Sequence, residues 1–238
     1  MSQFKWCGYK WNTNERWGLC HPDRPYCWYD ESCVSIDASG NLNLICRYDP
    51  KTITNSEGVT MHPEFGVGLV SSDASNPKFR YGRYTWVAKL PKGKNLWPAL
   101  WMWSFDSWPP EIDVVEAWTN CSGSYYKFPL DWKVTTNVHF KENGANKHIK
   151  SKSVLMTKMP DPTKNFNEYE LIWLPDRLDF RYNKKNIRSV EDPKLMKYIN
   201  DNTQSGMNII MNNHITADYD QKTPSEPLIV KSFNYVSY

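Results

Sequence analysis

The strongest constraint on the fold of this chain is a series of short segments in which apolar and polar residues alternate between turn signals. Alternation with a period of two indicates β-strands that bury one face. Such segments span residues 34–46, 84–90, 96–104, 111–118, 133–140, 168–174, 178–182, 207–213 and 228–238. The first has Ser39-Gly40-Asn41 at its centre, which predicts a hairpin. Helical periodicity is weak and indicates one short helix, over residues 192–199. Many strands with almost no helix predict an all-β sandwich of two antiparallel sheets.

The 238 residues contain no linker-like stretch, internal repeat or low-complexity tract. All-β sandwiches of this length are often one domain, so we predict one domain over residues 1–238, with residues 1–33 as a Cys-rich N-terminal segment. The net charge is only +3 and no long basic run occurs, which argues against a nucleic-acid partner. No run of 18 apolar residues occurs either, so no membrane-spanning helix is predicted. We expect a monomer.

Cysteines cluster near the N-terminus. Five of the six lie in the first 46 residues, at Cys7, Cys20, Cys27, Cys33 and Cys46, and the sixth is Cys121. Their even number and clustering predict disulfide bonds and hence an extracellular, secreted protein, although no signal peptide is visible. The alternative is a set of buried thiols. A zinc site is not expected, because no C-x2-C pair occurs.

Aromatic residues are unusually abundant, with 12 Trp, 14 Tyr and 9 Phe. Part of this set fills the core, but the surplus indicates flat platforms on which sugar rings stack. Strand alternation puts Trp97, Trp101 and Trp103 on one face and Leu100 and Met102 on the other. We therefore predict that the Trp face lines a cleft, with a core position as the alternative for Trp103.

The segment Glu111-Ile-Asp-Val-Val-Glu116 places three carboxylates in one strand, where charged residues are normally depleted. A solvated edge strand is the simplest explanation, but Ile112 and the two valines require a buried face. Glu111 and Asp113 share a face, whereas Glu116 would point into the core of a regular strand. A buried carboxylate is costly, so we predict a β-bulge at Val114-Val115 that returns Glu116 to the acidic face.

The bulge sets the distance between the two glutamates. Their Cα atoms would lie about 13 Å apart at about 3.3 Å per step. Side chains that lean together would bring the carboxyl groups to roughly 5–6 Å. This separation is close to the value of about 5–5.5 Å in retaining glycosidases and shorter than the 6.5–9.5 Å of inverting ones.

Several stretches together resemble family 16 of the glycoside hydrolases, in the branch of laminarinases, agarases and carrageenases. They are residues 81–103, 108–116, 135–139, 166–182 and 232–238, so the likeness covers about residues 33–238. The resemblance implies a β-jelly roll with a substrate cleft across its concave sheet. It also implies that Glu111 is the nucleophile, that Asp113 assists it, and that Glu116 is the acid/base.

Further residues follow from the resemblance and from strand position. The resemblance places Trp97, Trp101 and Trp108 near the scissile sugar and favours a cleft role for His139. Trp118 flanks the acidic strand, and Asn212 and His214 are weaker cleft candidates. Asn234 stands where many members have an Asp that binds structural calcium, which argues against a calcium ion. No cofactor and no catalytic metal are expected.

These observations favour an endo-acting retaining hydrolase of a β-linked polysaccharide, with β-1,3- or mixed-linkage β-1,3-1,4-glucan as the first candidate. The acidic residues do not distinguish it from a hydrolase of agar or carrageenan, although a sulfated substrate would require Arg and Lys beside the cleft. A non-catalytic glycan-binding jelly roll is the third hypothesis, and the presence of all three acids argues against it.

Overall fold

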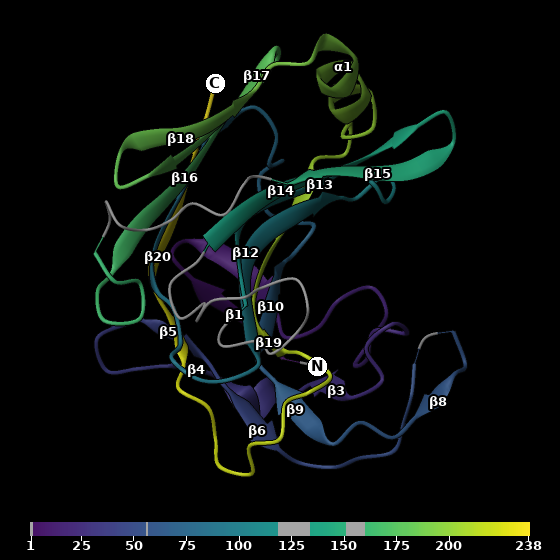
Figure 1. The fold of residues 1–238 in the computed structure, drawn as a ribbon, viewed down its shortest axis with the longest axis vertical. Helices are drawn as coiled ribbons and strands as arrows, with labels where there is room; N and C mark the ends of the chain where they lie inside the picture. Colours follow the sequence, from purple (N-terminus) through teal and green to yellow (C-terminus); the bar gives the residue numbers. More distant parts are fainter. Residues whose placement is uncertain (1, 56, 119–133, 151–159) are drawn as a thin grey trace.

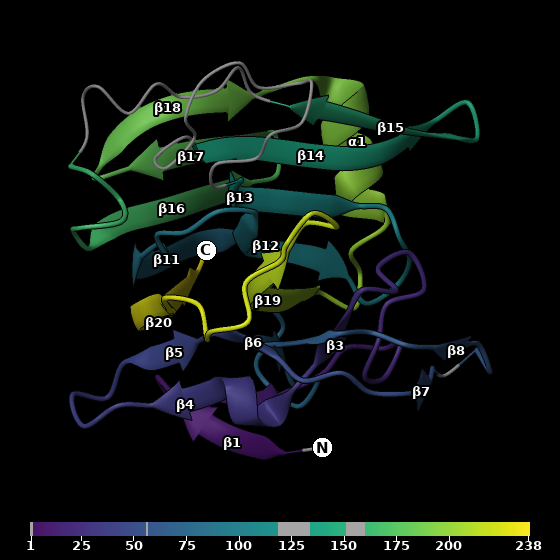
Figure 2. The same ribbon diagram turned by 60° about the horizontal axis from the view of Figure 1, so that its bottom comes forward.

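The computed structural model describes residues 2–55, 57–118, 134–150 and 160–238. Two antiparallel sheets form the body of the molecule as two layers (Figures 1 and 2). The first sheet has the order β1 (Gln3–Trp6), β2 (Tyr9–Asn12), β10 (Leu69–Ser72), β19 (Met207–Ile215), β12 (Leu96–Ser104), β13 (Glu111–Ala117), β14 (Val134–Glu142) and β15 (Ala145–Lys150). The second has the order β18 (Lys185–Val190), β17 (Arg177–Tyr182), β16 (Asn167–Leu174), β11 (Gly82–Lys89), β20 (Leu228–Ser237), β5 (Leu42–Leu44) and β4 (Val34–Ile36).

Smaller elements complete the described residues. A three-stranded sheet has the order β3 (Cys27–Tyr29), β9 (Phe65–Val67) and β6 (Cys46–Tyr48), and β7 (Ile53–Thr54) pairs with β8 (Thr60–Met61). The helical elements are the 3-10 turn Glu31–Cys33 and the helix α1 (Pro193–Asp201). The side chain of Asp192 caps α1 by accepting hydrogen bonds from the backbone N–H groups of Lys194 and Leu195. Neither described helix is long and apolar enough to cross a membrane.

The main core lies between the two sheets and follows from strand alternation. In β11 the residues Tyr84 and Trp86 are fully buried, whereas the alternating positions are partly or fully exposed. Leu100 and Met102 of β12 face the same core, as predicted. The inner face of the eight-stranded sheet therefore holds apolar side chains, and its outer face is left for the polar and aromatic residues of β12, β13 and β14.

Most predicted strands occur in the structure, including the β4–β5 hairpin around Gly40 and the short helix α1. The strands that were not predicted are β1 to β3, β6 to β10, β15 and β18. β15 is an edge strand with five of its six residues exposed, so its sequence carries no alternation that would distinguish it from a loop. β1 and β2 lie in the segment that was assigned to disulfide-bonded loops and instead extend the eight-stranded sheet at its other edge.

The predicted disulfides are wrong for the described cysteines, all five of which are free thiols. Cys7 is exposed in the β1–β2 turn, and the other four are buried. Burial raises the pKa of Cys20 to about 11 and the pKa values of Cys27 and Cys46 to about 12, so these side chains pack as neutral, weakly polar groups. Cys121 lies outside the described residues. The prediction of an extracellular protein rested on these bonds and stays a prediction.

Candidate active site

β13 contains the bulge that the sequence predicts. Between Asp113 and Glu116 it has two residues, Val114 and Val115, where β12 and β14 each have one. Both valines are completely buried in the main core. The bulge therefore brings Glu116 to the same outer face as Glu111 and Asp113.

Asp113 is the most buried of the three acids, with 4% of its surface exposed. Burial raises its pKa well above the usual value, and the negative charges of Glu111 and Glu116 raise it further. A hydrogen bond with Glu111 acts in the same direction. Asp113 is therefore a neutral acid that donates its proton toward Glu111.

Glu116 lies beside a cation that the sequence analysis missed. The Nζ atom of Lys150, the last residue of β15, lies 3.3 Å from Oε2 of Glu116. Burial raises the pKa of Glu116, whereas Lys150 lowers it and the charge of Glu111 contributes a smaller increase. Burial is thus a larger cause of the shift than repulsion between the two glutamates.

Glu111 is held by two neighbouring side chains. Nε1 of Trp108 donates a hydrogen bond to Oε2 of Glu111 at 2.6 Å. Nε2 of His139 lies 3.4 Å from a carboxylate oxygen of Glu111 and 3.4 Å from one of Asp113. Nδ2 of Asn137 is 3.0 Å from the same imidazole nitrogen. β14 therefore contributes polar residues that fix the position of the nucleophile candidate.

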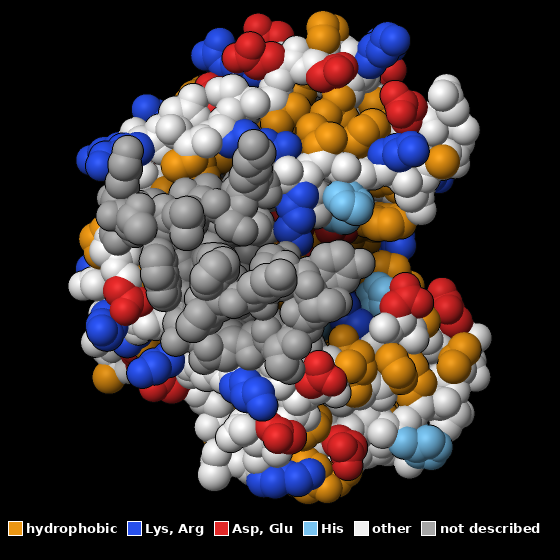
Figure 3. All heavy atoms as spheres, viewed as in Figure 1, with side chains coloured by type: hydrophobic (Ala, Val, Ile, Leu, Met, Phe, Trp, Pro, Cys, Tyr) orange, Lys and Arg blue, Asp and Glu red, His pale blue; other side chains and the backbone are white. Residues whose placement is uncertain are grey.

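The five predicted tryptophans all line one cavity of about 420 Å³ together with Glu111, Glu116 and His139; they are Trp97, Trp101, Trp103, Trp108 and Trp118. Asp113 and Asn212 line a second cavity of about 30 Å³, which shares Glu111 and Glu116 with the first. Nε1 of Trp101 donates a hydrogen bond to Oδ1 of Asn212 at 2.7 Å, which fixes the central tryptophan. Figure 3 shows a hollow in the molecular surface between the β14–β15 hairpin and the segment of β7 and β8.

The N-terminal segment supplies a wall of this cavity that the sequence analysis did not predict. Arg16, Trp17, His21, Asp23 and Arg24 all line the cavity. They precede the residues that resemble the family, and no local pattern marks them as cleft residues. They reach the cleft because the β1–β2 hairpin joins the edge of the sheet beside β10.

This wall covers two of the predicted platforms. The guanidinium carbon of Arg24 lies 4.7 Å from the ring centroid of Trp97, and Trp118 stacks on Trp97 with centroids 5.6 Å apart. The ring of Trp17 stacks on Trp103 with centroids 6.0 Å apart, and the guanidinium carbon of Arg16 lies 4.3 Å from the same ring. Trp103 therefore lies at the cleft, but it already has partners from its own chain.

Glu111, Asp113 and His139 each offer one potential metal ligand, and these atoms lie within 4.8 Å of one another. The same atoms already contact each other and the neighbouring polar residues, and Asp113 is held neutral. His214 lines the smaller of the two cavities, where it is buried and contacts Arg24.

Comparison with known proteins places this geometry in a family. The model for Glycosyl hydrolases family 16 matches residues 40–229. The chain belongs to this family. One relative is the "Beta-1,3-glucan-binding protein" of Penaeus monodon, 31% identical over 181 residues, which are 71% of this chain and 41% of the relative. Another is the "Glucan endo-1,3-beta-glucosidase A1" of Niallia circulans, 25% identical over 71% of this chain and 25% of the relative. The chain thus spans less than half the length of either relative.

Solved structures of the family share the fold. The laminarinase catalytic domain of Thermotoga maritima matches with a TM-score of 0.63 and 18% identity, over 90% of this chain and 83% of that chain. A family 16 protein of Bacteroides ovatus, solved with a mixed-linkage glucan product, matches with a TM-score of 0.68 and 18% identity, over 95% of this chain and 94% of that chain. The predicted β-jelly roll of two antiparallel sheets is confirmed.

Proposed function

We propose that this chain is a retaining, endo-acting hydrolase of a β-linked polysaccharide with a β-1,3- or mixed-linkage β-1,3-1,4-glucan backbone. The observation that supports it most is the bulged strand β13, which puts Glu111, Asp113 and Glu116 on one face of a Trp-lined cavity. The names of two glucan-cleaving and glucan-binding relatives support the choice of a glucan backbone.

In this proposal Glu111 attacks the anomeric carbon of the sugar bound in the cavity. The neutral carboxyl of Glu116 donates its proton to the departing glycosidic oxygen, since its raised pKa keeps that proton available. In the second step the carboxylate of Glu116 accepts a proton from water, which attacks the same carbon and releases Glu111. The proton of Asp113 and the indole N–H of Trp108 stabilise the carboxylate of Glu111 before the first step and again when the second step releases it.

A glycan-binding role without catalysis is the competing hypothesis. One relative is named as a glucan-binding protein. Such a module has no use for a buried acid with a raised pKa beside a second carboxylate, because burying such groups costs stability. Perturbed carboxyls in a cleft are typical of catalytic sites. The site chemistry therefore favours the hydrolase.

The experiment is hydrolysis of laminarin, barley β-glucan, agarose and carrageenan, with sizing of the products. We expect short oligosaccharides from one or both glucans. Glu111→Gln should abolish nearly all hydrolysis because it removes the nucleophile, and Glu116→Gln should lower kcat/KM at least about 100-fold, the usual loss when general acid–base catalysis is removed. Glu142→Gln, at the exposed end of β14, is the matched control. Binding of glucan without cleavage would support the binding module instead, and cleavage of a galactan alone would refute the glucan assignment.

A further inference from the structure

The N-terminal wall of the cavity is rich in cationic side chains that the proposed reaction does not use. Arg16 and Arg24 each lie against a tryptophan of β12, Arg16 against Trp103 and Arg24 against Trp97. Both belong to the part of the chain before residue 40, where the family match begins. Their position beside the scissile site therefore bears on which glycan this chain accepts.

Arg24 is held in place but keeps donors available. Its guanidinium packs against the ring of Trp97, and Nη1 lies 3.5 Å from Nδ1 of His214. Burial lowers the pKa of His214 well below its usual value, so this imidazole is neutral and accepts the hydrogen bond. Among the described residues this is the one side-chain hydrogen bond of Arg24, whereas a guanidinium carries five N–H donors.

The carboxyl group of Glu15 is buried next to Arg24, but it is uncharged below about pH 7 and so does not neutralise the guanidinium there. Glu15 is 5% exposed, and neither of its carboxyl oxygens has a hydrogen-bond partner among the described residues. Burial raises the pKa of Glu15 to about 7, although Arg24 and Arg16 act against that shift. Below that pH the ionisable acids left near the guanidinium are Glu111 and the exposed Asp23.

The same wall weakens the recognition of a neutral sugar. Arg24 covers the ring of Trp97, and Trp17 with Arg16 covers Trp103, so two flat surfaces that could stack on sugar C–H faces are already occupied. Guanidinium groups take their place along this side of the cavity. Such groups bind carboxylate and sulfate oxygens with paired N–H donors, and they do so better than they bind neutral hydroxyls.

We propose that Arg24, with Arg16 beside it, binds an acidic substituent of the glycan, so that the preferred substrate is a β-glucan that carries sulfate ester or carboxylate groups. This inference rests on the proposed function and refines its substrate class. A sulfated substrate requires arginine beside the cleft, and the structure places two arginines there.

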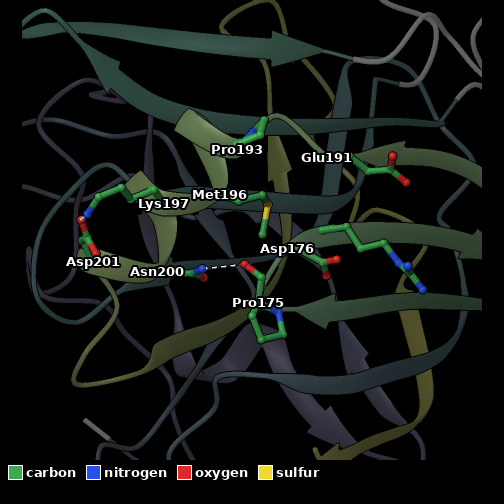
Figure 4. A pocket seen from close by; sticks show the side chains of 9 residues that line it. Pro175, Asp176, Glu191, Pro193, Met196, Lys197, Asn200 and Asp201 are labelled. Carbon is green, nitrogen blue, oxygen red and sulfur yellow. Dashed lines mark hydrogen bonds and ion pairs between the residues drawn. The ribbon is translucent and has the colours of Figure 1, made fainter.

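No other cavity supports a stronger inference. A cavity of about 580 Å³ lies beside α1, where Pro175, Met196 and Asn200 line it (Figure 4). Its charged residues Lys197 and Asp201 pair with each other at 2.6 Å and point along the helix surface. Among its described lining residues, the one buried polar atom without a partner is Oδ1 of Asn200, and Nδ2 of the same amide already donates to the carbonyl of Pro175 at 2.7 Å.

The test compares three forms of one β-1,3-glucan: the neutral polymer, its sulfate ester and its carboxymethyl derivative. Dissociation constants are measured with the Glu116→Gln protein, so that the glycan is not consumed. We expect at least one charged form to bind roughly tenfold or more tightly than the neutral form, as for a charge-assisted pair of hydrogen bonds. The sulfate and carboxymethyl forms show which acidic group is preferred.

Added Arg24→Gln should remove most of this preference, and Arg24→Lys should restore only part of it because Lys lacks the paired donors. Arg80→Gln is the matched control, since Arg80 lies 4.7 Å from the ring of Tyr81, outside the cavity. Equal binding of all three polymers, or a preference that survives Arg24→Gln, would overturn the proposal. Cleavage of the neutral glucan by the unmodified protein would still support the proposed function in that case, whereas failure to bind or cleave any of the three would refute both.

Discussion

At the scale of single residues, the proposed mechanism gives different roles to two carboxyl groups of similar intrinsic acidity. Glu116 is buried beside Lys150, whereas Glu111 accepts a hydrogen bond from Trp108 and faces the neutral acid Asp113. Burial raises the pKa of Glu116, and Trp108 donates a hydrogen bond to Glu111. In the proposed function these surroundings suit Glu116 to the role of the acid and Glu111 to that of the nucleophile.

The ammonium group of Lys150 gives the first prediction. It lowers the pKa of Glu116, which burial has raised, so Lys150→Gln should raise that pKa further. Because Glu116 must be protonated in the first step, the alkaline limb of kcat/KM should move to higher pH, by about one unit for the loss of a close opposite charge. Lys147→Gln, on an exposed position of the same strand, should leave the limb in place. A limb that moves to lower pH in Lys150→Gln would contradict the assignment of Glu116 as the acid.

Glu15 gives a prediction on stability. Its pKa is about 7 in the folded protein against a usual value of 4.5, so the folded state binds the extra proton. The contribution of Glu15 to the free energy of unfolding is most favourable below about pH 4.5. It decreases by roughly 3 kcal/mol as the pH rises to about 7. The free energy of unfolding, measured with urea, should therefore increase for Glu15→Gln relative to the unmodified protein as the pH rises between these values. Above them the difference should be constant. A difference that does not vary with pH would show that Glu15 titrates normally.

At the scale of elements, the acidic strand β13 was the most predictable part of the molecule. Ile112, Val114 and Val115 require a buried face, and Glu116 is tolerable only if a bulge turns it outward, so burial and charge together determined the register. The N-terminal elements could not be predicted in this way. The contact of Arg24 with Trp97 joins residues far apart in the sequence, and the exposed edge strand β15 has no alternation that would place Lys150 beside Glu116.

Deletion of Val114 tests the role of the bulge. Without the extra residue Glu116 would return to the core face of β13, where an unpaired carboxylate is strongly unfavourable. The deletion should abolish hydrolysis and destabilise the protein by several kcal/mol, measured by thermal unfolding. Val114→Ala keeps the residue count and should be destabilised by about 1–3 kcal/mol, while the remaining folded protein stays active. An active deletion variant would show that the bulge does not position Glu116.

At the scale of the whole molecule, the residues that stabilise the fold and those that line the proposed site lie on opposite faces of the eight-stranded sheet. Apolar residues of both sheets fill the space between the layers, while the outer face of β12, β13 and β14 carries the tryptophans and acids of the cavity. The fold and the three acids followed from the sequence because both depend on local alternation. Whether the cysteines form disulfides did not follow from the sequence, because their count and spacing are compatible with disulfides or with buried thiols. Only the packing around Cys27, Cys33 and Cys46 distinguishes the two.

The central claim is that Glu111 and Glu116 hydrolyse a β-linked glucan by two successive displacements. Proton NMR of the reaction, recorded from the first turnovers before the products equilibrate, measures the anomeric configuration of the new reducing end directly. Two displacements at the same carbon restore the original configuration, so the account predicts that the β-anomer forms first and the α-anomer appears later by mutarotation. First formation of the α-anomer would mean a single displacement by water and would contradict the role of Glu111 as nucleophile.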